Sequence, residues 1–227
     1  GQANRFHLNG RVERPMANGR LGISLNYFDL DSENPGSLRL DQFEQDPTQV
    51  FKPAYFDNKT GKEVQQGQLG VSWAGAFGGL TTEASVYGLT RDFYNPLPGD
   101  IVDVERSAGG ARLTLSRSFQ GNGVEFGLHG GLAFDFQSDL RREYGNDGGQ
   151  LGPLQQDQKE RVRSLGFFAQ GTAALNERVD LVAGIRYDRA RFEVEDLFPV
   201  TPGENEDDSG SRTMDAISPT VGVHFSV

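Results

Sequence analysis

Apolar and polar residues alternate with a period of two along most of the chain, and the period of an amphipathic helix is hard to find. The clearest case is GVEFGLHGGLAFDF at 123–136, in which every second residue from Val124 is apolar or glycine. Between them stand Glu125, His129 and Asp135, together with small residues. Such alternation is typical of a strand that has one apolar face and one hydrated face.

Similar alternation recurs in further stretches, so the pattern predicts about nine strands in an all-β, antiparallel protein. The stretch 80–92 predicts one strand whose facing is ambiguous, because Ala84 and Val86 compete with Tyr87 and Leu89 for the apolar side. Each stretch can supply the ~9–11 residues with which a tilted strand crosses a bilayer. The other apolar sets are Phe6/Leu8/Val12, Leu21/Ile23/Leu25/Tyr27, Leu69/Val71/Trp73, Ala111/Leu113/Leu115/Phe119, Leu165/Phe167/Ala169, Leu181/Ala183/Ile185/Tyr187 and Val221/Val223/Phe225/Val227.

Short and long connections between these stretches follow one another in turn. Tight turns are expected at Asn18-Gly19, Gly78-Gly79, Asn122-Gly123 and Asn176-Glu177, and long polar loops at about 31–63, 93–101, 139–158 and 197–212. Asn-Gly suits two-residue hairpins because it accepts positive φ angles. Short periplasmic turns opposite long extracellular loops are typical of a meandering transmembrane β-barrel. A soluble β-sandwich would share the alternation, although it rarely segregates its loops in this way.

Aromatic residues strengthen the barrel interpretation. Trp73, Phe77 and Phe119 lie near short turns, whereas Tyr27, Phe134, Phe136 and Tyr187 lie near the far strand ends, as two membrane interfaces favour. Val124, Phe126, Leu128, Leu132, Phe134 and Phe136 would then face lipid. The lumen would receive Glu125, His129, Asp135 and Gln137, and on later strands Arg186, Asp188 and His224. A slip of one residue would place carboxylates in hydrocarbon, so the register is strongly fixed.

Composition narrows the function classes. Only 36% of the residues are hydrophobic, and no run approaches the ~18 apolar residues of a membrane-spanning helix. The absence of cysteine excludes disulfides and thiolate metal sites. A net charge of −10 argues against a nucleic-acid partner, which would require a basic stripe.

The odd number of strands suggests an incomplete barrel. Bacterial single-chain barrels have an even number of strands, and unpaired strand edges do not occur in lipid. We therefore expect residues 1–227 to be part of one β-barrel domain, with strands missing on both sides. The alternative is that the pattern fails to reveal one strand, in which case a small ten-strand barrel would be possible.

Several phrases, taken in order, resemble the barrels of TonB-dependent outer-membrane receptors. No single phrase is a strict motif, but their order and spacing are fairly specific and cover nearly the whole chain. They are SENPGSLRLDQF (32–43), VYGLTRDFYNPLP (86–98) with DVERSAGGARLTLS (103–116), KERVRSLGFFAQGTAALNERVDLVAGIRYDRARFEVED (159–196) and DAISPTVGVHFSV (215–227).

This resemblance implies a barrel of about 22 strands with a plugged lumen, in the outer membrane of a Gram-negative bacterium. It implies import of ferric siderophores, or of similar scarce solutes, driven by the TonB complex through an N-terminal segment. This sequence contains neither that segment nor the plug. Outer-membrane lipid and lipopolysaccharide are further expected partners. A passive porin-like diffusion barrel and, behind it, an outer-membrane hydrolase stay open as alternatives.

The candidate chemistry favours binding over catalysis, and no catalytic residue or cofactor is expected. The spacing of metal ligands is not found among His7, His129 and His224. The sequence also has no lipid-facing Ser/His pair, which a phospholipase would need. Arginine forks suit anionic chelates and aromatic rings suit stacking, although an ordinary barrel rim carries the same residue types. The acidic run at 204–208 could bind Ca²⁺ but reads more simply as a solvated loop. The candidate ligand-binding residues are Arg91, Tyr94, Arg106, Arg141, Arg142, Tyr144, Tyr55 and Phe56.

Overall fold

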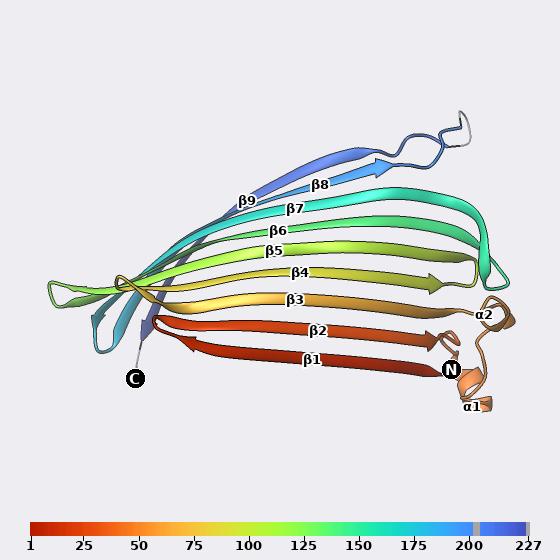
Figure 1. Ribbon diagram of the computed structural model, residues 1–227, viewed down its shortest axis with the longest axis horizontal. Coiled ribbons are helices and arrows are strands. Elements are labelled where there is room, and N and C mark those ends of the chain that lie inside the picture. The colour runs from red at the N-terminus through yellow and green to blue at the C-terminus, as the bar shows by residue number, and fades with distance from the viewer. Residues whose placement is uncertain (202–204, 226–227) are drawn as a thin grey trace.

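The computed structural model describes residues 1–201 and 205–225, which form a single antiparallel sheet (Figure 1). Within these residues nine strands lie in sequence order, each paired with the strand before and after it. Two short helices, α1 (Leu40–Gln45) and α2 (Pro53–Asp57), lie between the second and third strands. The strands are β1 (Ala3–Met16), β2 (Gly19–Glu33), β3 (Gly61–Phe77), β4 (Leu80–Pro96), β5 (Asp100–Gly121), β6 (Val124–Asp147), β7 (Gln150–Asn176), β8 (Val179–Asp196) and β9 (Gly210–Phe225).

The connections segregate to the two ends of the sheet, as predicted. The turns β1–β2, β3–β4, β5–β6 and β7–β8 lie at one end, and both helices lie at the other (Figure 1). At the β5–β6 turn Asn122 and Gly123 have φ angles of 51° and 79°, the left-handed pair that closes a two-residue hairpin. The β1–β2 turn falls at residues 17–18 and the β7–β8 turn at 177–178, each one residue from its predicted place.

Two of the four predicted long loops are wrong. Residues 139–158 continue as paired strand, since β6 ends at Asp147 and β7 begins at Gln150 after a turn at Gly148 and Gly149 with φ angles of 62° and 83°. The predicted loop 93–101 shrinks to residues 97–99. These strands run far past the ~9–11 residues that cross a bilayer. Along residues 139–158 the strands stay paired, although the apolar–polar alternation that signals a strand is lost.

The register settles which residues share a face. Ile23 pairs with Val71, Val71 with Val86, Val86 with Ala111 and Ala111 with Phe134, so one row of apolar side chains crosses five strands. Val86 and Ala84 therefore belong to this apolar face, and Tyr87 and Leu89 belong to the opposite one. We call the side that carries Phe134 the apolar face and the side that carries Asp135 the polar face. The apolar face includes Val124, Phe126, Leu128, Leu132, Phe134 and Phe136 of β6.

The sheet has almost no core of its own. Val64 and Ile101 are the buried hydrophobic residues in the described part of the chain, whereas Leu128 and Ile185 are each 54% exposed. The described residues form one layer, so the two packed sheets of a sandwich are not present. An apolar surface of this extent needs apolar surroundings to be stable. Neither short helix has the length or hydropathy that a membrane-spanning helix requires.

The β6–β7 hairpin tip depends on glycine and offers a test of the strand extension. Gly149 has a left-handed backbone, and a side chain there would also meet Lys59 Cδ at 2.6 Å. Gly149→Val should cost ~1–2 kcal/mol in backbone strain alone. Cleavage of the tip by limited proteolysis of the full-length protein should therefore accelerate roughly 5–30-fold. Gly88→Val, in β4 where a Cβ meets nothing within 4 Å, is the control. Equal cleavage of both variants would contradict the paired tip.

Candidate ligand-binding site

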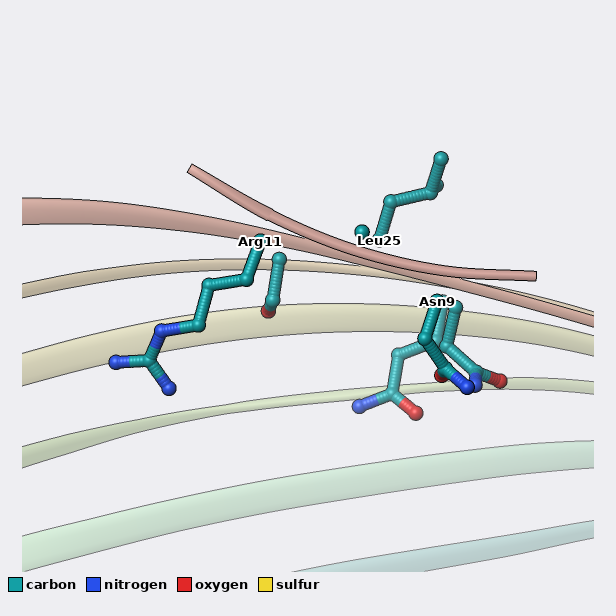
Figure 2. Close-up of a pocket in the computed structure, with 7 residues that line it drawn as sticks. Asn9, Arg11 and Leu25 are labelled. Atoms are coloured by element: carbon teal, nitrogen blue, oxygen red, sulfur yellow. The ribbon is translucent and has the colours of Figure 1, made fainter. Parts of the chain in front are cut away.

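The two faces of the sheet separate clearly at its β1–β2 edge. Figure 2 shows Asn9 and Arg11 on one side of the strands and Leu25 on the other. The polar side chains there line part of a pocket of about 430 Å³. His7 lies beside it, with Nε2 at 2.9 Å from Asn26 Nδ2. Within residues 1–201 and 205–225 no group of three or more acidic or histidine side chains is placed to hold a metal ion.

The polar face carries a buried ion pair between β5 and β6. Arg106 and Asp139 are opposite one another in the register, and the guanidinium donates two hydrogen bonds to the carboxylate at 2.9 and 2.6 Å. Gln137 donates a third at 3.0 Å. Asp139 is only 2% exposed, so this carboxylate is fully engaged inside the polar face. The bidentate geometry fixes the direction of the Arg106 fork.

Arg91 lies beside this ion pair, and one of its hydrogen-bond donors has no partner among the described residues. It stands directly opposite Arg106 in the β4–β5 register. Its Nε is buried and has no hydrogen-bond partner among the described residues. An unpartnered buried donor is costly, and two adjacent guanidinium groups repel each other. An anion bound between them would lower both costs, which makes Arg91 a candidate anion-binding residue.

Register divides the other candidate residues between the two faces. Arg141 shares the polar face and forms an ion pair with Glu143. Tyr94, Arg142 and Tyr144 fall on the side of the apolar face, away from Arg91, Arg106 and Arg141. Tyr94 is opposite Glu63 and Asp103, and Arg142 lies 3.3 Å from Glu105 and 3.7 Å from Asp157.

The two aromatic candidates of the long loop have different roles. Phe56 is 75% exposed on α2, where it is available to a ligand. Tyr55 instead packs edge-on against Phe51, with ring centroids 5.8 Å apart, and helps to hold the loop together. Asn146 at the β6–β7 tip donates to the backbone oxygens of Asn58 at 2.9 Å and Leu97 at 2.8 Å. Three connections at this end are thereby joined.

The residues expected in the lumen all share the polar face. Tyr87 donates to Asp135 at 2.8 Å, and Ser116 Oγ lies 2.7 Å from His129 Nδ1. Arg186 donates to both oxygens of Asp188 at 2.7 and 2.6 Å, His224 lies 3.3 Å from Asp180, and Glu125 is exposed. Sequence reasoning missed Asp139, Tyr87 and Asn146. Asp139 lies four residues after Asp135 on β6, so the alternation of the sequence already places both on the same face.

Two loop carboxylates have lowered pKa values. Hydrogen bonds from the Thr48 hydroxyl and backbone N–H lower the pKa of Asp46. Those from Ser209 do the same for the pKa of Asp207 in the acidic run. Glu204, which begins that run, lies outside the described residues, as does Val227. Asp207 thus engages its own loop, as a solvated loop residue does.

Comparison with known proteins gives consistent matches. Residues 2–227 match the family described as "TonB dependent receptor-like, beta-barrel". The ferric citrate transporter FecA aligns with a TM-score of 0.79 at 14% identity, over 99% of this chain and 34% of that one. The alcaligin receptor FauA of Bordetella pertussis aligns at 0.73 and 14%, over 99% and 33%. The copper transporter OprC aligns at 0.63 and 16%, over 96% and 34%. At these identities the structural likeness establishes the fold.

The buried pair makes a testable contribution to stability. Asp139→Ala leaves the Arg106 charge unpaired in a largely buried position, which should cost about 1–3 kcal/mol. Asp188→Ala removes an exposed partner of Arg186 and should cost less than about 1 kcal/mol. Urea unfolding of the full-length protein in lipid vesicles measures both free energies. Similar costs for the two variants would show that the Arg106–Asp139 pair is not specially placed.

Proposed function

Because the chain belongs to the TonB-dependent receptor β-barrel family, we propose that it forms part of an outer-membrane receptor that imports ferric siderophores or similarly scarce solutes. The chain spans about a third of the length of the solved structures that it matches. The plug, the remaining barrel strands and the segment that contacts the TonB complex would come from other parts of the receptor. Active transport is therefore a property of that whole protein.

In this proposal the sheet is an arc of the barrel wall in the outer membrane of a Gram-negative bacterium. The apolar face contacts lipid and the polar face lines a hydrated lumen. In the described residues β1 pairs only with β2, and β9 only with β8. Strand edges in hydrocarbon must be paired, so further strands would adjoin both edges. Family membership over residues 2–227, joined to this division of faces, is the observation that carries the proposal.

The ligand would be an anionic ferric chelate that binds on the extracellular part of the polar face. Arg91 supplies a buried, unpartnered Nε, and directly opposite it lies the Arg106 guanidinium, whose charge is balanced by Asp139. Charged oxygens of a chelate suit such forks. Phe56, exposed on α2, is a candidate for the first encounter with the ligand. In this proposal the side chains of the polar face bind and release a solute without breaking any of its bonds.

Transport can be tested in cells. A strain that lacks the gene should grow poorly when iron is limited to one chelate, and expression of the full-length receptor should restore uptake of radioactive iron. Uptake should disappear when TonB is deleted. Uptake that persists without TonB would instead identify a passive diffusion barrel.

The anion subsite predicts a specific binding defect. Arg91→Gln removes a charge-assisted hydrogen bond worth about 1.5–3 kcal/mol, so ferric chelate should bind roughly 10–100-fold more weakly. Arg142→Gln, on the other face, should leave affinity unchanged. Fluorescence titration of the purified full-length receptor measures both constants. An unaltered affinity for Arg91→Gln would remove this residue from the site.

The lipid contact predicts a difference between two neighbouring positions. Leu132→Arg places a charge on the apolar face and should destabilise the barrel by about 2–4 kcal/mol. Ala133→Arg places the same charge on the polar face and should cost much less. Unfolding of the full-length receptor in phospholipid vesicles provides the comparison. If Ala133→Arg proved the more damaging, the assignment of the faces would be reversed.

A further inference from the structure

Asn146, at the tip of the β6–β7 hairpin, joins three connections through its hydrogen bonds. Its side-chain nitrogen donates to the backbone oxygen of Asn58, 88 residues away in the long β2–β3 loop, and to that of Leu97, 49 residues away in the β4–β5 turn. Its backbone N–H donates to the backbone oxygen of Gly99 at 2.9 Å, and its side-chain oxygen accepts from the N–H of Gly149 at 2.7 Å. We call these five residues the rim lock.

Further contacts bring the same three connections together. The side chain of Asn58 donates to the backbone oxygen of Pro98 in the β4–β5 turn. The aliphatic stem of Lys59 lies so close to Gly149 that a Cβ there would meet Lys59 Cδ at 2.6 Å. The β6–β7 pairing shifts register on both sides of Tyr144, as bulges do where they bend a hairpin, and Figure 1 shows the tip bending toward α2. The tip is thereby brought within reach of the long loop.

The rim lock reaches the C-terminal end of α2, because Asn58 directly follows this helix. The N–H of Asn58 donates to the backbone oxygen of Ala54 at 3.1 Å, and that of Lys59 donates to Phe56 at 3.1 Å. Lys59 has a φ angle of 48°, the left-handed conformation in which helices commonly end. A helix of five residues is too short to be stable by itself. The position of α2 is therefore set by what holds its end, and Asn146 holds Asn58.

The other contacts of α2 determine which of its side chains points outward. Tyr55 packs against Phe51, and a Cβ on Gly36 would meet Tyr55 Cε1 at 2.9 Å. Phe56 is the next residue along the helix and is exposed. Consecutive residues of a helix do not share a face. The direction of the Phe56 ring thus follows from the placement of α2 as a whole.

We propose that Asn146 is a positioning residue for solute capture, which holds α2 against the hairpin tip so that Phe56 is presented in a fixed place before the solute arrives. An aromatic ring on an unfixed loop would have to be ordered on binding, and that ordering weakens affinity. A ring that is already fixed avoids this cost and can stack on a flat or apolar part of a chelate. The inference rests on the proposed import function and adds that the rim around α2 is ordered ahead of binding.

Hydrogen exchange of the full-length receptor in detergent, without any solute, tests the rim lock directly. Asn146→Asp keeps the size of the side chain and the oxygen that accepts from Gly149, but it removes both donors. Amide exchange in residues 54–60 should accelerate roughly 10-fold, because two hydrogen bonds worth about 2–10-fold each are lost. Asn146→Ala should behave in the same way.

The matched control is Asn205→Ala, which removes a side chain that donates to the backbone oxygen of Pro199 within its own loop. This variant should leave exchange in residues 54–60 as it is in the wild type. Unchanged exchange in both Asn146 variants would overturn the proposal.

A double-mutant cycle on uptake of radioactive iron tests whether the rim lock acts through Phe56. The probe is the ferric chelate that supports growth of the wild-type strain. Asn146→Asp should raise KM several-fold and leave the maximal rate unchanged, since the lock acts in capture and not in translocation. Phe56→Ala should raise KM likewise, and the combined variant should be no worse than Phe56→Ala alone, because a ring that is absent cannot be misplaced. Additive effects, or a loss confined to the maximal rate, would overturn the role of Asn146 in capture.

The two experiments separate this inference from the proposed function. Exchange is measured without solute, so it reports on the rim lock whatever the receptor imports. If no ferric chelate supports TonB-dependent growth of the wild type, the proposed function is refuted. Normal wild-type uptake, together with unchanged exchange in the Asn146 variants, would refute the positioning role alone.

Discussion

Backbone hydrogen bonding in hydrocarbon is the constraint on which this structure depends. Water is absent there, so each N–H and C=O of a spanning strand must pair with a neighbouring strand. Pairing fixes the register, and the register fixes which side chains share a face. The row from Ile23 through Val71 and Val86 to Phe134 follows from these pairings and not from any packed core. The sheet therefore depends for its stability on apolar surroundings, such as lipid, against its apolar face.

The same alternation frees the other face for polar chemistry. Asp139 can be 2% exposed because Arg106 and Gln137 satisfy its oxygens inside the polar face, away from lipid. Arg91 can keep a buried donor unpartnered because strand pairing, and not its own contacts, holds β4 in place. A scaffold whose stability comes from its backbone pairing therefore tolerates an electrostatically unfavourable position such as the buried Nε of Arg91.

The sequence predicted the fold well where a strand needs apolar residues on one face and polar residues on the other. Val124 to Phe136 alternates because one face meets hydrocarbon, and the structure places those residues as expected. Residues 139–158 lack this alternation, so the sequence predicts a loop where the structure has a paired hairpin end. The site was less predictable. Tyr94 is three residues from Arg91 and hence on the other face, and the Arg106–Asp139 pair depends on a register set across 33 residues.

The central claim is that β6 presents one face to lipid and the other to a hydrated lumen. The chain has no cysteine, so single cysteines can be introduced at each position from 124 to 136 and spin-labelled in the full-length receptor in lipid vesicles. Collision with oxygen, which concentrates in lipid, should peak at the even positions, and collision with an aqueous nickel complex should peak at the odd ones. A profile without this alternation, or with its phases exchanged, would contradict the account.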